Sequence, residues 1–353
     1  MAQLATDATG IGVGTTTPGL VCAHHHLYSS LARGMPAPPS TPTSFREILE
    51  QIWWRLDCAI DLEMIRWSAK LGALEALECG TTTIIDHHES PNAIEGSLDV
   101  IAEACAEVGV RVVCAYGVTD RHGAQGAQRG LAENERFLRA GGRGYVGVHA
   151  AFTCEQGTLE AAADLAERHD VGVHIHVAES LDDADASSKI ASLSNHQWLV
   201  IHAVHLDEAA NVRGTIVHNP RSNLNNAVGY CNPARFQNPI ALGTDGIGAN
   251  MFEEFRLAYV LQRCVDVTAT PDTAWSWLAT GRDLVPDAAN DIIEWNYDRA
   301  NDPWSSAFTT DIRPLQVVID GETVLRDGSP TRVDPIEIRR VAHEQSQRLF
   351  ARL

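Results

Sequence analysis

Three consecutive histidines at the end of an apolar run are the feature that most constrains this chain. His24, His25 and His26 follow a Pro-Gly pair and the short run 20–23. Successive side chains of an extended strand alternate between its two faces, so His24 and His26 point the same way while His25 points to the other side. Two imidazoles on one face can bind one cation. The pattern predicts a metal site at a strand end, completed by ligands from later strands.

Strand-like runs recur along the chain and alternate with segments of helical periodicity. The predicted strands are residues 20–26, 81–88, 110–116, 144–153, 171–179, 198–206, 214–219 and 239–245. The predicted helices that lie among them are residues 62–79, 97–108, 131–140 and 159–169. Eight strands in this order predict an α/β fold, a (β/α)8 TIM-like barrel, which places its chemistry at the carboxyl ends of the strands.

The later part of the barrel is expected to be shortened. Only residues 207–213 separate the sixth and seventh strands, whereas a crossover helix needs about a dozen residues or more. After the last strand, helices are predicted at 251–266 and 271–278, and then short strands at 289–295, 315–319 and 323–325 around an Asp320-Gly321 turn.

These patterns give a domain organisation. We expect the barrel over residues 18–282, a small truncated β appendage over residues 1–17 and 283–333, and a C-terminal helix over residues 334–353.

Charge and hydropathy limit the partners and the location. The formal net charge is −19, which argues against nucleic acid or an anionic membrane as partner, because phosphate binding needs clustered lysine and arginine. The chain has no apolar run of about 18 residues, and its first residues lack the basic and apolar regions of a signal peptide. A cytoplasmic protein that binds a small molecule is expected, and a homodimer is left open.

Four residues at predicted strand ends have the chemistry of ligands for one divalent cation. A zinc-type catalytic site uses three or four nitrogen and oxygen ligands and one open position for water. His24, His26, His176 and Asp245 supply such a set. Zinc suits these ligands best, and iron or manganese can use them too. Asp245 can also accept a proton from the attacking water, although a helix N-cap is its simpler structural interpretation.

Two further residues are candidates for proton transfer. Glu179 lies three positions beyond His176 at the tip of the same strand, where a carboxylate above a metal can carry protons. His202, at the end of the sixth predicted strand, can polarise the water without binding the metal. Trp53 and Trp54 belong to the helical segment after the first strand, and either cover the pocket or pack in the core.

Taken together, the motifs resemble the amidohydrolase superfamily over nearly the whole chain. They are Pro18-Gly19-Leu20 before His24-His25-His26, Gly80 before Asp86-His87-His88, His149 to Thr153, His176 to Glu179, His202 to Leu206, Asn219 to Asn223, and Leu242 to Gly246. The chain is most similar to the cytosine-deaminase-like and chlorohydrolase-like aminohydrolases. Residues 86–92 match the Asp-His-His-X-Ser-Pro-Asn pattern of one group in this branch.

The resemblance implies roles for these residues. It implies a single metal on the four ligands named above, without a carboxylated lysine. Glu179 would protonate a ring nitrogen of the substrate and carry a proton to the leaving group, while His202 and Asp245 orient and deprotonate the water. His149 and Asn223 match positions that face the substrate.

Three more residues are candidate substrate contacts from their position alone. Tyr28 and Arg33 follow the first ligands, and Arg33 is equally compatible with a solvated surface. His87 and His88 alternate faces, so at most one of them points into the pocket, and His87 has a structural role as its alternative.

We therefore expect a metal-dependent hydrolase that deaminates an aminated nitrogen heterocycle, such as a purine, pyrimidine or triazine-like compound. The same site can serve a dechlorinating or a cyclic-amide hydrolase. A noncatalytic degenerate barrel is the third interpretation, because few residues precede the first strand and the later connections are short. The acid Glu179 argues against it, since a scaffold has no need of a proton carrier.

Overall fold

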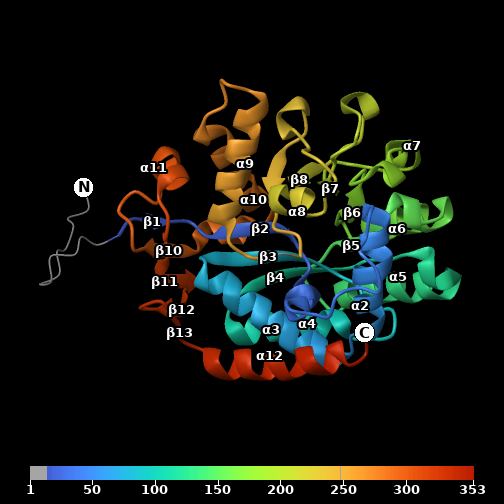
Figure 1. Ribbon diagram of the computed structural model, residues 1–353, viewed down its shortest axis with the longest axis horizontal. Coiled ribbons are helices and arrows are strands. Elements are labelled where there is room, and N and C mark those ends of the chain that lie inside the picture. The colour runs from blue at the N-terminus through green and yellow to red at the C-terminus, as the bar shows by residue number, and fades with distance from the viewer. Residues whose placement is uncertain (1–13, 247) are drawn as a thin grey trace, which may run out of the picture.

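The computed structural model describes residues 14–246 and 248–353, which form a barrel of parallel strands and an antiparallel sheet at its side (Figure 1). The barrel strands are β2 (Leu20–His25), β3 (Thr81–His88), β4 (Arg111–Tyr116), β5 (Val146–Ala150), β6 (Val173–Val177), β7 (Leu199–His202), β8 (Thr215–His218) and β9 (Ile240–Leu242). All eight predicted strands are present, and the predicted (β/α)8 barrel is confirmed.

The barrel is assembled from two sheets. Strands β2 to β4 pair in parallel, as do strands β5 to β9. Three parallel bridges join these sheets and close the barrel in the described residues: Cys114 with Gly144, Val118 with Val148, and His25 with Asp245. Every residue of the eight strands is buried, as expected for strands covered on both faces. The carboxyl ends of β2 and β9 therefore lie side by side.

Helices α3 to α6 cover the first half of the barrel. They are α3 (Leu62–Glu78), α4 (Ser97–Val108), α5 (Gly123–Arg139) and α6 (Gln156–Arg168). The prediction for α5 began eight residues too late, because the first turns of this helix are rich in glycine and glutamine and show no apolar periodicity. Helix α3 buries one face of alanine, leucine and isoleucine against the barrel.

The second half of the barrel has short connections, as predicted. After β6 comes the five-residue helix α7 (Ala186–Ile190), and after β8 the six-residue helix α8 (Pro220–Asn225). Among the described residues, the connection between β7 and β8 holds a single turn of 3-10 helix, Glu208–Ala210, and no α-helix.

Two longer helices complete the barrel after β9. They are α9 (Met251–Val265) and α10 (Pro271–Leu284). Helix α10 packs against β9 and β2. It runs six residues beyond its predicted end at residue 278.

The antiparallel sheet has the order β1 (Thr16–Thr17), β10 (Ile292–Trp295), β11 (Pro314–Ile319), β12 (Glu322–Arg326) and β13 (Ser329–Pro330). Asp320 and Gly321 connect β11 to β12 with positive φ angles of 52° and 82°, which fits the predicted hairpin turn. Helix α11 (Pro303–Phe308) was not predicted, and the Asp302 side chain caps it. Residues 1–13 of the predicted appendage lie outside the described residues, and the domain boundaries stay a prediction.

Arg111 on β4 fastens this sheet to the barrel. Its guanidinium donates two hydrogen bonds to Asp291, at 2.8 and 3.0 Å, and one of 2.5 Å to Asp320. The Asp291 side chain is completely buried and that of Arg111 is 4% exposed. The sequence alone did not indicate this pair.

The C-terminal helix α12 (Pro335–Phe350) packs against α3 along the edge of the barrel (Figure 1). Within residues 14–246 and 248–353, none of the helices is both long enough and apolar enough to cross a lipid bilayer.

Candidate metal centre and its pocket

A pocket lies at the carboxyl ends of the barrel strands. It collects most of the residues that the sequence predicted to be functional. Those that line it are His26, Tyr28, His149, His176, Glu179, His202 and Asp245.

Strained backbone places several of these side chains. His202 has a φ of 70° and Asp245 a φ of 57°, and Ala178, immediately before Glu179, has a φ of 47°. A left-handed conformation is uncommon in residues other than glycine, costs of the order of 1–3 kcal/mol, and tends to occur at functional sites. Each of these turns lies at the end of a barrel strand, where it directs the chain into the pocket.

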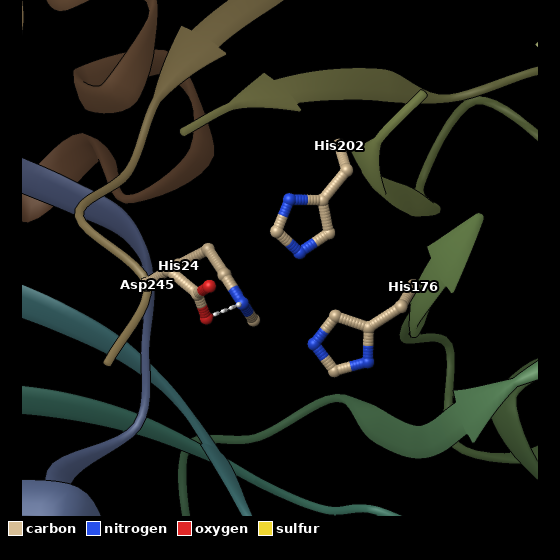
Figure 2. Close-up of side chains that lie close together, drawn as sticks. All are labelled: His24, His176, His202 and Asp245. Atoms are coloured by element: carbon tan, nitrogen blue, oxygen red, sulfur yellow. Dashed lines mark hydrogen bonds and ion pairs between the residues drawn. The ribbon is translucent and has the colours of Figure 1, made fainter. Parts of the chain in front are cut away.

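The predicted metal ligands converge at the floor of this pocket. His24, His176, His202 and Asp245 bring one ligand atom each within 4.8 Å of the others (Figure 2). Oδ1 of Asp245 lies 3.1 Å from Nε2 of His24 and 3.0 Å from Nε2 of His26. Nε2 of His26 lies 3.3 Å from Nε2 of His176. The structure thus brings the four predicted ligands together and adds His202, which the sequence interpretation had kept outside the ligand set.

His87 belongs to a second, overlapping group. Ring nitrogens of His26, His87 and His176 also lie within 4.8 Å of one another. His87 is completely buried, its ring centroid lies 4.7 Å from that of His176, and it is not among the residues that line the pocket. Its burial outside the pocket lining favours the structural alternative over the expected substrate contact. Strand alternation indicates the face of the strand on which His87 lies, but it does not indicate whether the side chain reaches the pocket or stays buried in the barrel.

Each proposed histidine ligand uses its remaining nitrogen in a hydrogen bond away from the site. Nδ1 of His26 donates to the His87 carbonyl at 2.6 Å, and Nδ1 of His176 donates to the His149 carbonyl at 2.5 Å. Nδ1 of His24 instead lies 2.8 Å from Nε2 of His174. Such outer contacts fix the ring orientation and the tautomer of histidines that bind metals. The three Nε2 atoms consequently lie on the side that Asp245 shares with them.

The charge of Asp245 suits a ligand. Burial alone would raise the pKa of its carboxyl, but the hydrogen bonds with His24 and His26 outweigh burial and hold the pKa well below its ordinary value. Burial would likewise lower the pKa of His26, and Asp245 instead raises it to about 9. Asp245 is therefore an anion that holds a proton on the imidazole of His26, and a bound cation would displace that proton.

Glu179 faces His202, one of the convergent donors. Oε2 of Glu179 lies 3.5 Å from Nε2 of His202. Burial, and then the charge of Asp245, raises the pKa of Glu179 well above its ordinary value. On its other side, Nδ1 of His202 donates to Oδ1 of Asn223 at 2.7 Å. Asn223 therefore orients His202 and is not among the residues that line the pocket, contrary to its expected contact with substrate.

Arg33 also lies away from the pocket. It follows the 3-10 helix Leu27–Ala32, and its guanidinium donates to both carboxylate oxygens of Glu75 at 2.7 Å. More than half of its side chain is exposed. The expected substrate contact is thus replaced by the surface alternative. Tyr28 and His149 are the positional candidates that do line the pocket.

A pair of buried acids forms another part of the pocket wall. Asp57 and Glu89 both contact the guanidinium of Arg121, and Oε1 of Glu89 lies 3.6 Å from Nε2 of His149. Burial raises the pKa of both carboxyls, that of Glu89 to about 8. Two carboxylates thus share one guanidinium. Sequence reasoning missed this pair, although Glu89 directly follows the Asp86-His87-His88 motif.

Aromatic side chains complete the pocket. The segment α1 (Phe45–Ile48), the π-helical turn Leu49–Trp53 and α2 (Trp54–Ala59) direct Phe45, Trp53 and Trp54 toward it. The guanidinium of Arg121 lies 4.3 Å from the Trp54 ring centroid. Of the two interpretations for the tryptophans, the structure favours the wall of the pocket.

Comparison with known proteins agrees with this geometry. The model of the amidohydrolase family matches residues 15–279. A 5′-deoxyadenosine deaminase of Methanopyrus kandleri is 29% identical, over 94% of this chain and 86% of that protein. An 8-oxoguanine deaminase of Pseudomonas aeruginosa is 28% identical, over 90% and 83%.

Solved structures share the fold. An adenosine deaminase from Xanthomonas campestris with bound zinc superposes with a TM-score of 0.78 at 23% identity, over 95% of this chain and 85% of that one. An atrazine chlorohydrolase from Arthrobacter aurescens in complex with zinc gives a TM-score of 0.75 at 19% identity, over 94% and 88%. The family and the cluster of histidines and aspartate together indicate a divalent metal. The chain belongs to the amidohydrolase family and is a hydrolase that acts on carbon–nitrogen bonds other than peptide bonds.

Proposed function

We propose that this protein hydrolytically deaminates an aminated nitrogen heterocycle, with a purine, pyrimidine or triazine-like ring as substrate. One observation carries the proposal. A set of imidazole and carboxylate donors converges in the same pocket as a carboxyl group and an imidazole placed 3.5 Å apart, Glu179 and His202. The names of the curated relatives, deaminases of a deoxyadenosine and of an oxidised guanine, support the same reaction class.

The donor set fits a divalent cation, and we propose zinc. His24, His26, His176 and Asp245 would hold it, with three Nε2 atoms and one carboxylate oxygen, a ligand set that iron and manganese can also use. When bound, the metal supplies a Lewis acid that makes water a nucleophile at neutral pH.

The protein's own residues move the protons. In the proposed reaction water adds to the ring carbon that bears the amino group, and Asp245 accepts a proton from this water. Glu179 donates its proton to the adjacent ring nitrogen, takes up the remaining proton of the added hydroxyl and passes it to the amine, which leaves as ammonia while the ring carbon becomes a carbonyl. The proton that Asp245 accepted then returns to Glu179, so that both carboxyls regain their starting state. His202, with its Nδ1 proton held by Asn223, presents the lone pair of Nε2 to orient the water.

The pocket wall favours a flat, uncharged ring. Phe45, Trp53 and Trp54 offer apolar surface against which an aromatic heterocycle can pack. Asp57 and Glu89 both contact the guanidinium of Arg121, so its positive charge is already paired and the wall favours donor groups such as hydroxyls and amines over phosphate or carboxylate.

The test is release of ammonia by the zinc-loaded protein across a panel of aminopurines, aminopyrimidines and aminotriazines, beside the variant Asp245→Asn. Release that the variant loses would establish deamination and identify the ring class. If protein that holds one zinc releases no ammonia from any compound of the panel, the proposal is contradicted. Chloride release from chlorotriazines in the same assay would then favour dechlorination.

A further inference from the structure

His174 is the outer partner of the first metal ligand. His26 and His176 donate their Nδ1 protons to backbone carbonyls, which every residue type provides. His24 differs, because its Nδ1 lies 2.8 Å from Nε2 of His174, a side chain of another strand. Both rings are completely buried. The orientation of His24 therefore depends on the identity of one residue in β6.

The direction of this hydrogen bond decides whether His24 can bind a cation. A neutral imidazole carries one proton, and a ring that offers Nε2 to a metal must carry it on Nδ1. Nε2 of His24 faces Oδ1 of Asp245 at 3.1 Å, which is the side of the proposed metal. Nδ1 of His24 must then donate, and Nε2 of His174 must accept. In the opposite arrangement the proton of His24 moves to Nε2 and blocks the ligand position.

The surroundings of His174 hold its ring in place. It meets the ring of His87 with centroids 4.9 Å apart at 71°, and the ring of Tyr145 with centroids 6.1 Å apart at 77°. Its own Nδ1 is buried and has no hydrogen-bond partner within the described residues. The pair with His24 is thus its one side-chain hydrogen bond in the described part of the chain. A role in packing alone would not require an acceptor nitrogen at this position.

We propose that His174 is a positioning residue for the metal centre. It holds His24 in the tautomer with the proton on Nδ1 and turns Nε2 toward the cation. The inference rests on the metal centre of the proposed function, but it concerns metal affinity and not turnover. Removal of an outer partner of this kind typically lowers metal affinity about 10- to 100-fold.

Zinc affinity of purified variants, measured by competition with a chromophoric chelator, tests the proposal. His174→Phe keeps a ring of similar size and removes the acceptor, while His174→Gln restores an acceptor oxygen at about the place of Nε2. His218→Phe is the matched control, because His218 is equally buried and neither of its ring nitrogens has a hydrogen-bond partner in the described structure. We expect His174→Phe to bind zinc about 10- to 100-fold more weakly, His174→Gln to recover most of the loss, and the control to match the wild type.

Two results would overturn the proposal. One is wild-type zinc affinity in His174→Phe, and the other is an equal loss in His174→Phe and His218→Phe, which would reveal a general packing effect. If His174→Phe does not fold, nitrogen NMR of the zinc-loaded wild-type protein tests the proposal instead. The proposal requires a proton on Nδ1 of His24 that is hydrogen-bonded to Nε2 of His174, and a spectrum without it would overturn the proposal. A wild-type chain that binds no zinc would instead refute the metal centre, and with it the proposed function.

Discussion

Nε2 of His202, the last residue of β7, lies 3.5 Å from Oε2 of Glu179, which follows the neighbouring strand β6. Both strands end in left-handed backbone, at His202 itself and at Ala178. Without these turns the chain would continue along the strand, and the imidazole would not meet the carboxyl. The barrel thus uses local strain to pair a candidate proton carrier with a candidate water-orienting group.

Glu179→Gln should separate metal binding from turnover. The amide keeps the size of the side chain but has no proton to transfer, so we expect ammonia release to fall about 10²- to 10⁴-fold. Because Glu179 belongs to neither donor group, the variant should retain its zinc. Zinc per chain by elemental analysis, measured beside the reaction rate, checks both points, and loss of zinc together with activity would contradict this placement.

Zinc should stabilise the metal-free protein against heat. A ligand that binds only the folded state at about 1,000 times its Kd contributes about 4 kcal/mol, so the Tm of chelator-treated protein should rise on addition of zinc. Asp245→Asn weakens a ligand that contacts both His24 and His26, and should lose most of this rise. Asp182→Asn is the control, because Asp182 is an exposed aspartate of the 3-10 helix Leu181–Asp183 beside the pocket. An equal rise in all three proteins would argue against Asp245 as a ligand.

Much of the barrel could be predicted from sequence because parallel strands buried on both faces appear as uninterrupted apolar runs. In such a fold the carboxyl ends of all strands meet at one rim, so polar residues that end these runs converge wherever they lie in the sequence. This is why His24, His176 and Asp245, separated by more than 200 positions, could be assigned to one cluster before the structure was known.

Depth and loop paths could not be predicted in the same way. Alternation assigned His87 to a face but not to a layer, and the structure buries it outside the pocket lining. Arg33 directly follows a 3-10 helix that packs against α3, and it reaches Glu75 instead of the pocket. Asp57 enters the wall from a helical segment without a clear periodic pattern, so its pairing with Glu89 has no local signal.

Phosphorylated substrates should be poor substrates of this enzyme. Glu89 and Asp57 already occupy the guanidinium of Arg121, so its positive charge is not available to a phosphate at this wall. If an aminopurine nucleoside is turned over, we expect its 5′-monophosphate to have a kcat/KM at least about tenfold lower, which corresponds to about 1.4 kcal/mol. Glu89→Gln should narrow that ratio, whereas Glu160→Gln, an exposed residue of α6, should leave it unchanged. Equal kcat/KM values for nucleoside and monophosphate would contradict the role of the wall.

Glu254 should make stability depend on pH. Burial raises its pKa from 4.5 to about 7, although Arg221 opposes the shift. A carboxyl whose pKa is higher in the folded than in the unfolded state stabilises the fold fully below pH 4.5, and this contribution is lost as the pH rises through 7. The free energy of unfolding that is lost in this way corresponds to about 3 kcal/mol. Glu254→Gln cannot titrate, so the difference in free energy of unfolding between wild type and variant should change between pH 5 and pH 8. If this difference in free energy of unfolding stays the same at every pH, the pKa of Glu254 is not raised in the folded protein.

Arg111→Met should destabilise the protein strongly, because it leaves the completely buried Asp291 without its partner. Removal of one member of a buried ion pair typically costs 3–5 kcal/mol. The loss should be visible as a lower free energy of unfolding in urea. Arg143→Met is the matched control, since Arg143 also pairs with an aspartate, Asp287, but both side chains are about half exposed and their contact should contribute little. If the buried charge is the cause, the double variant Arg111→Met/Asp291→Asn should recover part of the loss. Equal effects of the two arginine variants would show that this ion pair does not fasten the antiparallel sheet to the barrel.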